Sequence, residues 1–317
     1  MTTAAPREAA AAVAAPAVRG RSPGRIAYER LRRDPAALLG LAIVTVFVVT
    51  ALAAPLLAGL NGWRPETFDK SAIDQALGGV PKGDFGGIGA EHWLGVEPGN
   101  GRDVFSRIVY GARVSLLIAV AATAVTVLAG TAVGLVAGYF GGRIDTVLSR
   151  IMDLVMSFPS LIFMLALLSI APGTDRVLLL VLIMSMFSWP YVGRIVRGQT
   201  LSVRHREFVD AARVNGAMGP HILLREILPN IAAPILVYTT LAIPANIGTE
   251  AALSFLGVGV RPPTPSWGQM IDNGLLWYQV APTYFMIPCV CLFLTVLAFT
   301  LLGDALRDAL DPKGGGR

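Results

Sequence analysis

The chain has 317 residues, of which 54% are hydrophobic and only 15% are charged, and its mean hydropathy is +0.61. Soluble domains carry about 25% charged residues, so this composition argues against a soluble enzyme, a disordered chain and a disulfide scaffold. The formal net charge is +5, and the basic residues lie between apolar runs instead of forming the cluster typical of nucleic-acid binding. We therefore expect a membrane protein in contact with lipid and no nucleic-acid partner.

The windows between charged residues locate the membrane spans. The hydrocarbon core of a bilayer requires about 20 apolar helical residues. Six windows come near this length or exceed it, and none alternates as a β-strand would. The sequence therefore predicts an all-α polytopic membrane protein with six transmembrane helices. The predicted spans are 36–60, 114–142, 154–174, 177–193, 227–257 and 281–302.

The distribution of Lys and Arg predicts the orientation of the chain. Eighteen of these residues lie on the side that holds both termini, and eight lie on the other side. The positive-inside rule then places both termini in the cytoplasm. The predicted parts are a cytoplasmic N-terminal tail (1–35), a first transmembrane helix (36–60), an extracytoplasmic loop with an amphipathic helix at the membrane interface (61–113), a core of five transmembrane helices (114–303) that contains a cytoplasmic loop (194–229), and a cytoplasmic C-terminal tail (304–317).

Sequence signatures of enzymatic chemistry are missing. No GxxxxGK[ST] phosphate-binding loop occurs, and no histidine and acidic residue have the spacing of a metal site. We therefore expect no catalytic residue, no metal and no cofactor on this chain. Any ATP hydrolysis that drives it would belong to another subunit.

The cytoplasmic loop contains a predicted amphipathic helix that ends at Gly216. Its two faces carry Phe208, Ala211, Ala212 and Asn215 on one side, and Glu207, Asp210 and Arg213 on the other. A helix lying on the membrane surface would show this pattern. A helix that docks on a partner protein would show it too, because the small residues let another backbone approach closely.

This segment resembles the EAA motif of ABC-importer permeases, which consists of EAA, three residues, Gly, nine residues and IxLP. The matching residues here are Asp210, Ala211, Ala212, Gly216, Leu228 and Pro229. Asp210 replaces the first Glu, and Glu226 stands where the motif has Ile. Residues 101–116, 249–271 and 301–313 also resemble the dipeptide, oligopeptide and nickel permeases. The resemblance covers roughly residues 25–313 and is specific, because four separated segments match.

The resemblance implies the fold and the role of the chain. It implies a type I (MetI-like) permease subunit of an ATP-driven importer in a bacterial-type cell membrane. With a second homologous permease, the chain would form the path for di- or oligopeptides, with nickel as an alternative cargo. ATP and Mg would bind to one or two partner ATPase subunits. The EAA loop would dock on the ATPase through the residues Glu207, Asp210, Ala211, Ala212, Arg213, Gly216, Leu228 and Pro229.

The loop 61–113 allows two interpretations. It is rich in Gly and Pro, and up to Asp103 it carries seven acidic residues against four basic ones. It could be a docking surface for an extracytoplasmic substrate-binding protein, or a solvated connector between two spans. The resemblance favours docking.

Three features lie within the predicted spans. Gly130, Gly134 and Gly138 recur every four residues, which predicts close helix packing against a neighbour in this chain or in a partner. Glu250 and Asp153 are ionisable groups near span ends, and Glu250 is a candidate pathway residue. The alternative functions are a stand-alone ion-coupled transporter, which would need an acidic or cationic site near mid-membrane, and a receptor or scaffold, which would not explain the EAA loop.

Overall fold

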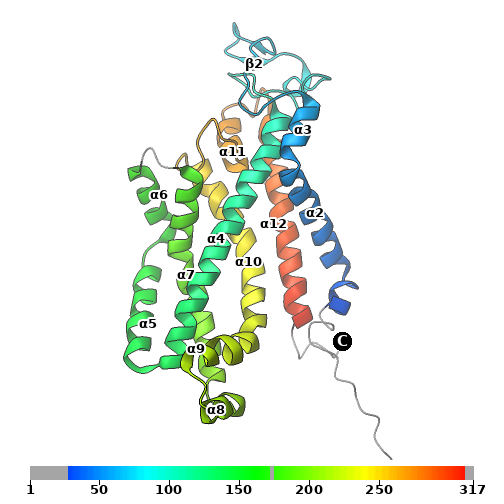
Figure 1. The fold of residues 1–317 in the computed structure, drawn as a ribbon. Helices are drawn as coiled ribbons and strands as arrows, with labels where there is room; N and C mark the ends of the chain where they lie inside the picture. The colour runs from blue at the N-terminus through cyan, green and yellow to red at the C-terminus, as the bar shows by residue number, and fades with distance from the viewer. Residues whose placement is uncertain (1–27, 172–174, 311–317) are drawn as a thin grey trace, which may run out of the picture.

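The computed structural model describes residues 28–171 and 175–310, and these residues are mostly helical. Figure 1 shows the long helices side by side, with a looped cap at one end and the short helix α8 at the other. The elements are α2 (Pro35–Leu52), α3 (Ala54–Asn61), β1 (Ile73–Asp74), β2 (Val80–Pro81), a 3₁₀ turn η1 (Asp84–Gly86), α4 (Val104–Phe140), α5 (Gly142–Met156), α6 (Ser160–Ile170), α7 (Arg176–Val203), α8 (Glu207–Val214), α9 (Gly219–His221), a π-helical turn η2 (Ile222–Ile227), α10 (Leu228–Phe255), α11 (Trp267–Leu275) and α12 (Pro282–Leu310).

The spanning helices agree with the predicted architecture. Among the described residues, five helices are long and apolar enough to cross a membrane: α2, α4, α7, the helix Gly219–Phe255 and α12. The consecutive helices α5 and α6 are inclined to one another by 79° and make a sixth span if they are counted together. The predicted all-α membrane protein is therefore confirmed, and the six predicted spans correspond to these five helices and the bent pair α5–α6.

The bounds of several spans differ from the prediction. Helix α4 begins at Val104 instead of 114, and α7 continues to Val203 instead of ending at 193. Helix α12 runs to Leu310, so residues 304–310 are helical and are not a tail. The prediction ended each span at a charged residue, but charge marks the end of an apolar window and does not break a helix. The predicted tail residues 1–27 and 311–317 lie outside the described residues.

Glycine residues of α4 allow close packing against α7. A Cβ on Gly130 would lie 2.5 Å from the Val192 side chain, and a Cβ on Gly134 would lie 2.6 Å from the carbonyl oxygen of Gly193. A Cβ on Gly138 would lie 2.6 Å from Thr200. Only glycine permits this separation, so the predicted small-residue packing occurs, and the neighbour is another helix of the same chain.

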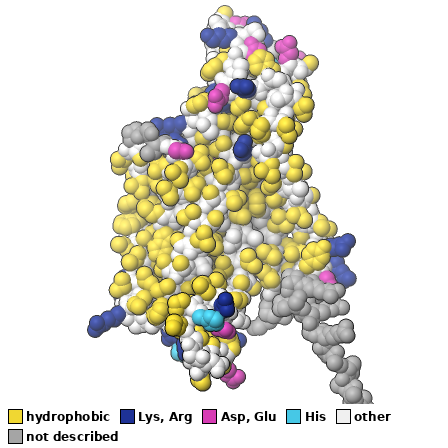
Figure 2. Space-filling model, viewed as in Figure 1, with side chains coloured by type: hydrophobic (Ala, Val, Ile, Leu, Met, Phe, Trp, Pro, Cys, Tyr) yellow, Lys and Arg dark blue, Asp and Glu magenta, His cyan; other side chains and the backbone are white. Residues whose placement is uncertain are grey.

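Charges and apolar side chains are segregated along the long axis. Figure 2 shows a broad hydrophobic band across the middle of the molecule, with charged side chains mainly above and below it. Both ends of the described chain lie at the end that carries α8, where the Arg30 guanidinium donates to the carbonyl oxygen of Asp308 at 3.4 Å. The opposite end carries residues 62–103, here called the cap loop, which includes the β1–β2 pair.

Candidate functional site

Helix α8 packs on the rest of the subunit around Val209, which is its one buried residue. The side chain of Val209 is 0% exposed and packs in a core cluster with Ile222, Ile227 and Val203. Phe208 and Ala212 pack against the same cluster and are half-buried. One face of α8 is therefore fixed to its own chain, and the remaining face is free for another contact.

Gly216 ends α8 in the left-handed conformation. Its φ is +80°, a region that glycine adopts without steric cost. The N–H of Gly216 donates to the carbonyl of Arg213, and the N–H of Ala217 donates to the carbonyl of Ala212, both at 3.0 Å. This is the glycine helix stop expected from the sequence, and it turns the chain sharply toward α9.

Apolar side chains are exposed at the tip of this loop. Val214 and Met218 are 88% and 80% exposed, and Ala211 beside them is also exposed. A hollow of about 570 Å³ opens next to them. Its lining residues are Ala212, Asn215, Gly216, Ala217, Met218, His221 and Glu226. Exposed apolar groups around a concavity, at the end of the molecule and outside its apolar band, are typical of a protein interaction site.

The polar face of α8 has an internal ion pair. The Arg213 guanidinium donates to Asp210 at 2.7 Å, one turn earlier, and it lies 5.6 Å from the ring centre of Tyr139 in α4. Glu207 is exposed at the start of the helix. The pairing with Tyr139 connects α8 to the end of α4, a contact that the sequence pattern did not reveal.

The end of the EAA-like segment lies within a continuous helix. Leu228 and Pro229 open α10 directly after the π-helical turn η2, so the chain continues as one helix. Proline is tolerated there because its missing N–H falls in the first turn of α10. Glu226, which replaces an apolar residue of the motif, lines the hollow beside α8. The departure from the motif therefore gives the hollow an acidic side chain.

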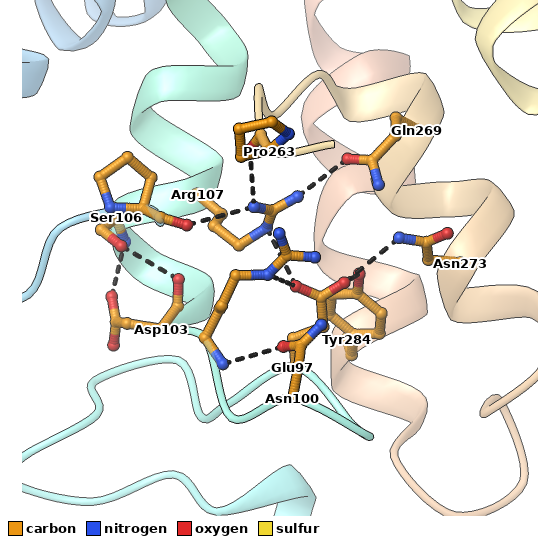
Figure 3. A network of polar contacts seen from close by, with 11 residues as sticks. Glu97, Asn100, Asp103, Ser106, Arg107, Pro263, Gln269, Asn273 and Tyr284 are labelled. Carbon is orange, nitrogen blue, oxygen red and sulfur yellow. Dashed lines mark hydrogen bonds and ion pairs between the residues drawn. The ribbon is translucent and has the colours of Figure 1, made fainter. Parts of the chain in front are cut away.

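A buried polar network joins the cap loop to three helices (Figure 3). Glu97 of the cap loop accepts hydrogen bonds from Arg102 at 2.7 Å, from the Tyr284 hydroxyl at 2.7 Å and from Asn273 at 3.2 Å. The Arg107 guanidinium lies 3.3 Å from the same carboxylate. Because Arg107, Asn273 and Tyr284 belong to α4, α11 and α12, one carboxylate connects the cap loop to three helices.

Arg107 extends this network to other segments. It donates to the carbonyl oxygens of Pro65 at 3.2 Å and Pro263 at 3.3 Å, and to the side-chain oxygen of Gln269 at 2.9 Å. Its side chain is 0% exposed. Burial alone would raise the pKa of Glu97, but the charges of Arg107 and Arg102 outweigh this effect and hold the pKa below its ordinary range.

The network corrects the expectation of a separate amphipathic helix before residue 114. Arg102 and Arg107 are buried in the network and do not form a solvated face. Asp103 caps the N-terminus of α4 by accepting the N–H of Ser106 at 2.7 Å, so the helix starts there and runs on without a break. The sequence signal for this start was Asp103 itself, a preferred N-cap residue.

A second buried cluster lies beside the first. The ring nitrogens of His92 lie 2.9 Å from the Asp103 carboxylate and 3.3 Å from that of Asp69. Trp63 stacks on the His92 ring with a centroid separation of 4.6 Å. The cap loop thus has an interior of its own, and it is not simply a solvated connector.

Glu250 lies inside the subunit and does not face an open surface. Its side chain is 0% exposed and accepts hydrogen bonds from the hydroxyls of Ser115 at 2.9 Å and Ser254 at 2.8 Å. These hydroxyls in turn accept the backbone N–H groups of Trp267 and Val260. The arrangement fixes the segment between α10 and α11, and it gives no support to the expected pathway role.

The other ionisable group in the predicted spans forms ion pairs. Asp153 of α5 is bonded to Arg194 of α7 and lies 3.8 Å from Arg150. Arg197 of α7 holds Asp145 of α5 in the same way. These pairs fasten α5 to α7. Across residues 28–171 and 175–310, no group of three His, Cys, Asp or Glu side chains could hold a metal ion.

Comparisons with known proteins give consistent results over most of the chain. Residues 130–314 match the family described as binding-protein-dependent transport system inner membrane component. Residues 22–76 match the N-terminal TM domain of oligopeptide transport permease C.

Two relatives illustrate the match. The chain is 39% identical over 293 residues to the dipeptide transport system permease protein DppC of Alkalihalophilus pseudofirmus, which covers 92% of this chain and 90% of that protein. It is 42% identical over 228 residues to the glutathione transport system permease protein GsiD of Pectobacterium atrosepticum, which covers 72% and 74%. A chain of the MetNI methionine ABC transporter, solved in inward-facing conformations, matches 65% of this chain with a TM-score of 0.49 and 20% identity.

Proposed function

From the premise that this chain belongs to the family of binding-protein-dependent transport system inner membrane components, we propose that its cargo is a di- or oligopeptide. Membership makes the chain a permease subunit of an ABC importer. The peptide cargo is supported by the relatives, whose names specify dipeptide and glutathione transport. Glutathione is itself a small peptide, so both names point to one chemical class.

The proposal includes the partners. A second permease would complete the translocation path, and one or two ATPase subunits would supply the energy. The observation that supports the ATPase contact concerns residues 204–218, here called the α8 loop. At the apolar tip of this loop, Val214 and Met218 are 88% and 80% exposed beside the hollow. ATP and Mg would remain on the ATPase, because this chain lacks a phosphate-binding loop.

The proposed location is a bacterial inner membrane with both termini in the cytoplasm. The excess of Lys and Arg on the terminal side supports this orientation. The α8 loop lies at the same end as both ends of the described chain, where a cytoplasmic ATPase could reach it.

The cap loop would then face outward and receive a substrate-binding protein. This docking role is supported by the buried network of Glu97, Arg102 and Arg107, which gives the cap loop a fixed shape. A fixed surface loses less conformational entropy on binding than a mobile one. A stand-alone ion-coupled transporter finds no comparable support, because Glu250 is satisfied by two serines of its own chain.

The experiment is co-purification with a tagged chain. Wild type should bring an ATPase with it, and Ala211→Trp should not, because a large side chain at this exposed small position obstructs the partner while leaving the subunit's own packing intact. Ser202→Trp is the matched control, because Ser202 is also exposed and lies at the end of α7 that precedes α8. Retention of the ATPase by Ala211→Trp would contradict the coupling role.

A further inference from the structure

A hollow of about 550 Å³ opens between α3, the start of the cap loop and the adjacent end of α4. Figure 1 shows α3 beside this end of α4, below the cap loop. The lining contains two aromatic side chains, two charged side chains and small residues. The aromatic and charged residues are Trp63, Tyr110, Arg64 and Glu66, and the others are alanine, glycine and proline. The volume falls within the range of about 300–1,000 Å³ that is typical of small-molecule sites.

The hollow lies at the level where the bilayer core ends. Residues 114–140 of α4 carry no charge and form about 40 Å of helix, which is enough to cross a core of about 30 Å. Arg113 directly precedes this stretch, is exposed and pairs with no group in residues 28–171 and 175–310. An unpaired guanidinium is costly inside hydrocarbon, so Arg113 marks the level of the headgroups. Tyr110 of the hollow is its neighbour on the helix surface, one turn farther from the core.

Exposed leucines lie next to the hollow on the side of the core. Leu56 and Leu60 of α3 are 74% and 75% exposed, and they are one turn apart on the same face. Leu117 of α4, one turn beyond Arg113, is 57% exposed. Leu56 and Gly59 are neighbours on the surface of α3, and Gly59 lines the hollow. Acyl chains that extend from the hollow toward the core would therefore contact an apolar surface.

The aromatic wall of the hollow is fixed by contacts within the cap loop. The indole N–H of Trp63 donates to the carbonyl oxygen of Glu91 at 3.0 Å. The Trp63 ring also stacks on His92 with a centroid separation of 4.6 Å. Trp and Tyr are enriched at the headgroup level of membrane proteins, because their rings are apolar and carry one polar group. Trp63 and Tyr110 therefore fit a site at the membrane interface.

The two charged side chains of the hollow are available for a ligand. Arg64 and Glu66 are exposed, and neither side chain makes a hydrogen bond or an ion pair within the described parts of the chain. They have opposite charges and line the same hollow. A ligand that carries one negative and one positive group could therefore use both.

The backbone between these two charges is held in place. The carbonyl oxygen of Pro65 accepts a hydrogen bond from the buried Arg107 at 3.2 Å. The carbonyl oxygen of Arg64 accepts the N–H of Thr67 at 3.1 Å. A ligand bound to Arg64 and Glu66 would not have to order this turn, which lowers the entropic cost of binding.

We propose that the hollow binds the headgroup of a zwitterionic phospholipid with a primary amine, of the phosphatidylethanolamine type. The phosphate accepts hydrogen bonds from Arg64, the ammonium donates to Glu66, and the acyl chains extend along the leucines of α3. A guanidinium matches the geometry of a phosphate, and a carboxylate is a strong acceptor for an ammonium group. A lipid is favoured over a segment of a substrate-binding protein, because the hollow lies at the bilayer level below the cap loop. The inference holds for any cargo.

The first test fills the hollow. A Cβ on Gly59 would meet nothing within 4 Å, so Gly59→Trp leaves the subunit's own packing intact, and Gly198→Trp in α7 is the matched control with equal space. The assembled transporter is delipidated and mixed with equimolar phosphatidylethanolamine and phosphatidylglycerol, and native mass spectrometry counts the bound lipids. We expect the wild type and Gly198→Trp to retain one phosphatidylethanolamine that Gly59→Trp loses. Equal retention by all three would overturn the inference.

The second test separates the two ends of the headgroup and uses variants that do not change the volume of the hollow greatly. Arg64→Gln should lower retention of both lipids by about fivefold or more, because both carry the phosphate. Glu66→Gln should lower the ratio of phosphatidylethanolamine to phosphatidylglycerol by about twofold to fivefold, which is the range for an exposed ion pair. Lys82→Gln, at an exposed charge elsewhere in the cap loop, should change neither. An unchanged ratio in Glu66→Gln would overturn the proposed recognition of the amine.

The third test examines other occupants. Glycerophosphoethanolamine has the same headgroup without acyl chains, and at millimolar concentration it should not displace the lipid. Displacement would identify a site for soluble phosphate esters and overturn the inference. If Gly59→Trp lost binding of the substrate-binding protein but retained the lipid, the hollow would be a protein docking site, and the inference would also be overturned.

Discussion

At the scale of single residues, Gly216 has a conformation that other residues resist. Its φ of +80° lies in the left-handed region, yet a Cβ there would meet nothing within 4 Å. A substitution therefore strains the backbone without a steric clash inside the subunit. The strain amounts to roughly 1–2 kcal/mol for a residue with a side chain, and a β-branched one resists most.

We predict that Gly216→Val inserts and folds but binds the ATPase weakly and loses uptake. The strained turn would move the tip of the loop away from its docking geometry. Membrane level, co-purified ATPase and uptake measure the three properties. Glu207→Gln is the comparison and should weaken docking less, because an exposed charge contributes at most about 1 kcal/mol. Normal ATPase recovery and uptake by Gly216→Val would show that the loop does not couple.

The pKa of Glu97 predicts how the stability of the folded protein depends on pH. Its pKa is lowered in the folded protein, because the charges of Arg107 and Arg102 outweigh the effect of burial. The folded state therefore binds fewer protons than the unfolded state. The stabilisation is present above the ordinary carboxyl pKa of about 4.3 and is lost as the pH falls through the lower folded value.

We predict that Glu97→Gln lowers the free energy of unfolding at neutral pH by about 3–5 kcal/mol, because Arg107 loses its buried partner. Thermal unfolding of the purified protein measures this change. The difference between wild type and variant should shrink as the pH falls below about 4. An unchanged difference across this range would mean that another group controls the acid response.

At the scale of elements, the contact between α4 and α7 depends on glycine. A single methyl group on Gly134 would lie 2.6 Å from the carbonyl oxygen of Gly193 and 2.7 Å from Val196. Gly198 in α7 offers a contrast, because a Cβ there meets nothing within 4 Å. The two positions separate the packing effect from the intrinsic effect of alanine in a helix.

We predict that Gly134→Ala lowers the unfolding free energy by about 1–3 kcal/mol through overpacking. Gly198→Ala should be neutral or stabilise by up to about 1 kcal/mol, because it only restricts the unfolded chain. Thermal unfolding in detergent gives both values. If the two variants behaved alike, the close approach of α4 and α7 would be disproved.

The sequence predicted those elements whose signal is local. Apolar windows located the spans, the four-residue glycine spacing predicted close packing, and Gly216 predicted the end of α8. The start of the third span at Gly142 was missed, because the charged residues of α5 lie outside the apolar window 154–174. The cap network was also missed: Glu97 and Tyr284 are 187 positions apart, and no spacing rule connects them.

At the scale of the whole molecule, the α8 loop and the cap loop lie at opposite ends. Any orientation in the membrane therefore places them on opposite sides. Gln75 in the cap loop and His205 before α8 are both exposed, and they provide matched positions for labelling.

We predict that Gln75→Cys, in a chain without Cys289 and Cys291, reacts with an impermeant thiol reagent in intact cells. His205→Cys should react only after the cells are permeabilised, because the basic residues keep that end inside. Labelling of His205→Cys in intact cells would reverse the topology and with it the assignment of the ATPase side.

The length of α4 has a mechanical consequence. Its 37 residues form one helix of about 56 Å, well beyond the roughly 30 Å of a bilayer core. Near one end, Arg107 is fixed in the cap network, and near the other, Tyr139 lies against Arg213 of α8. The two ends of this helix therefore extend beyond the bilayer core on opposite sides. A change in the tilt of α4 at one end would be transmitted to the other end, because the helix is continuous between them.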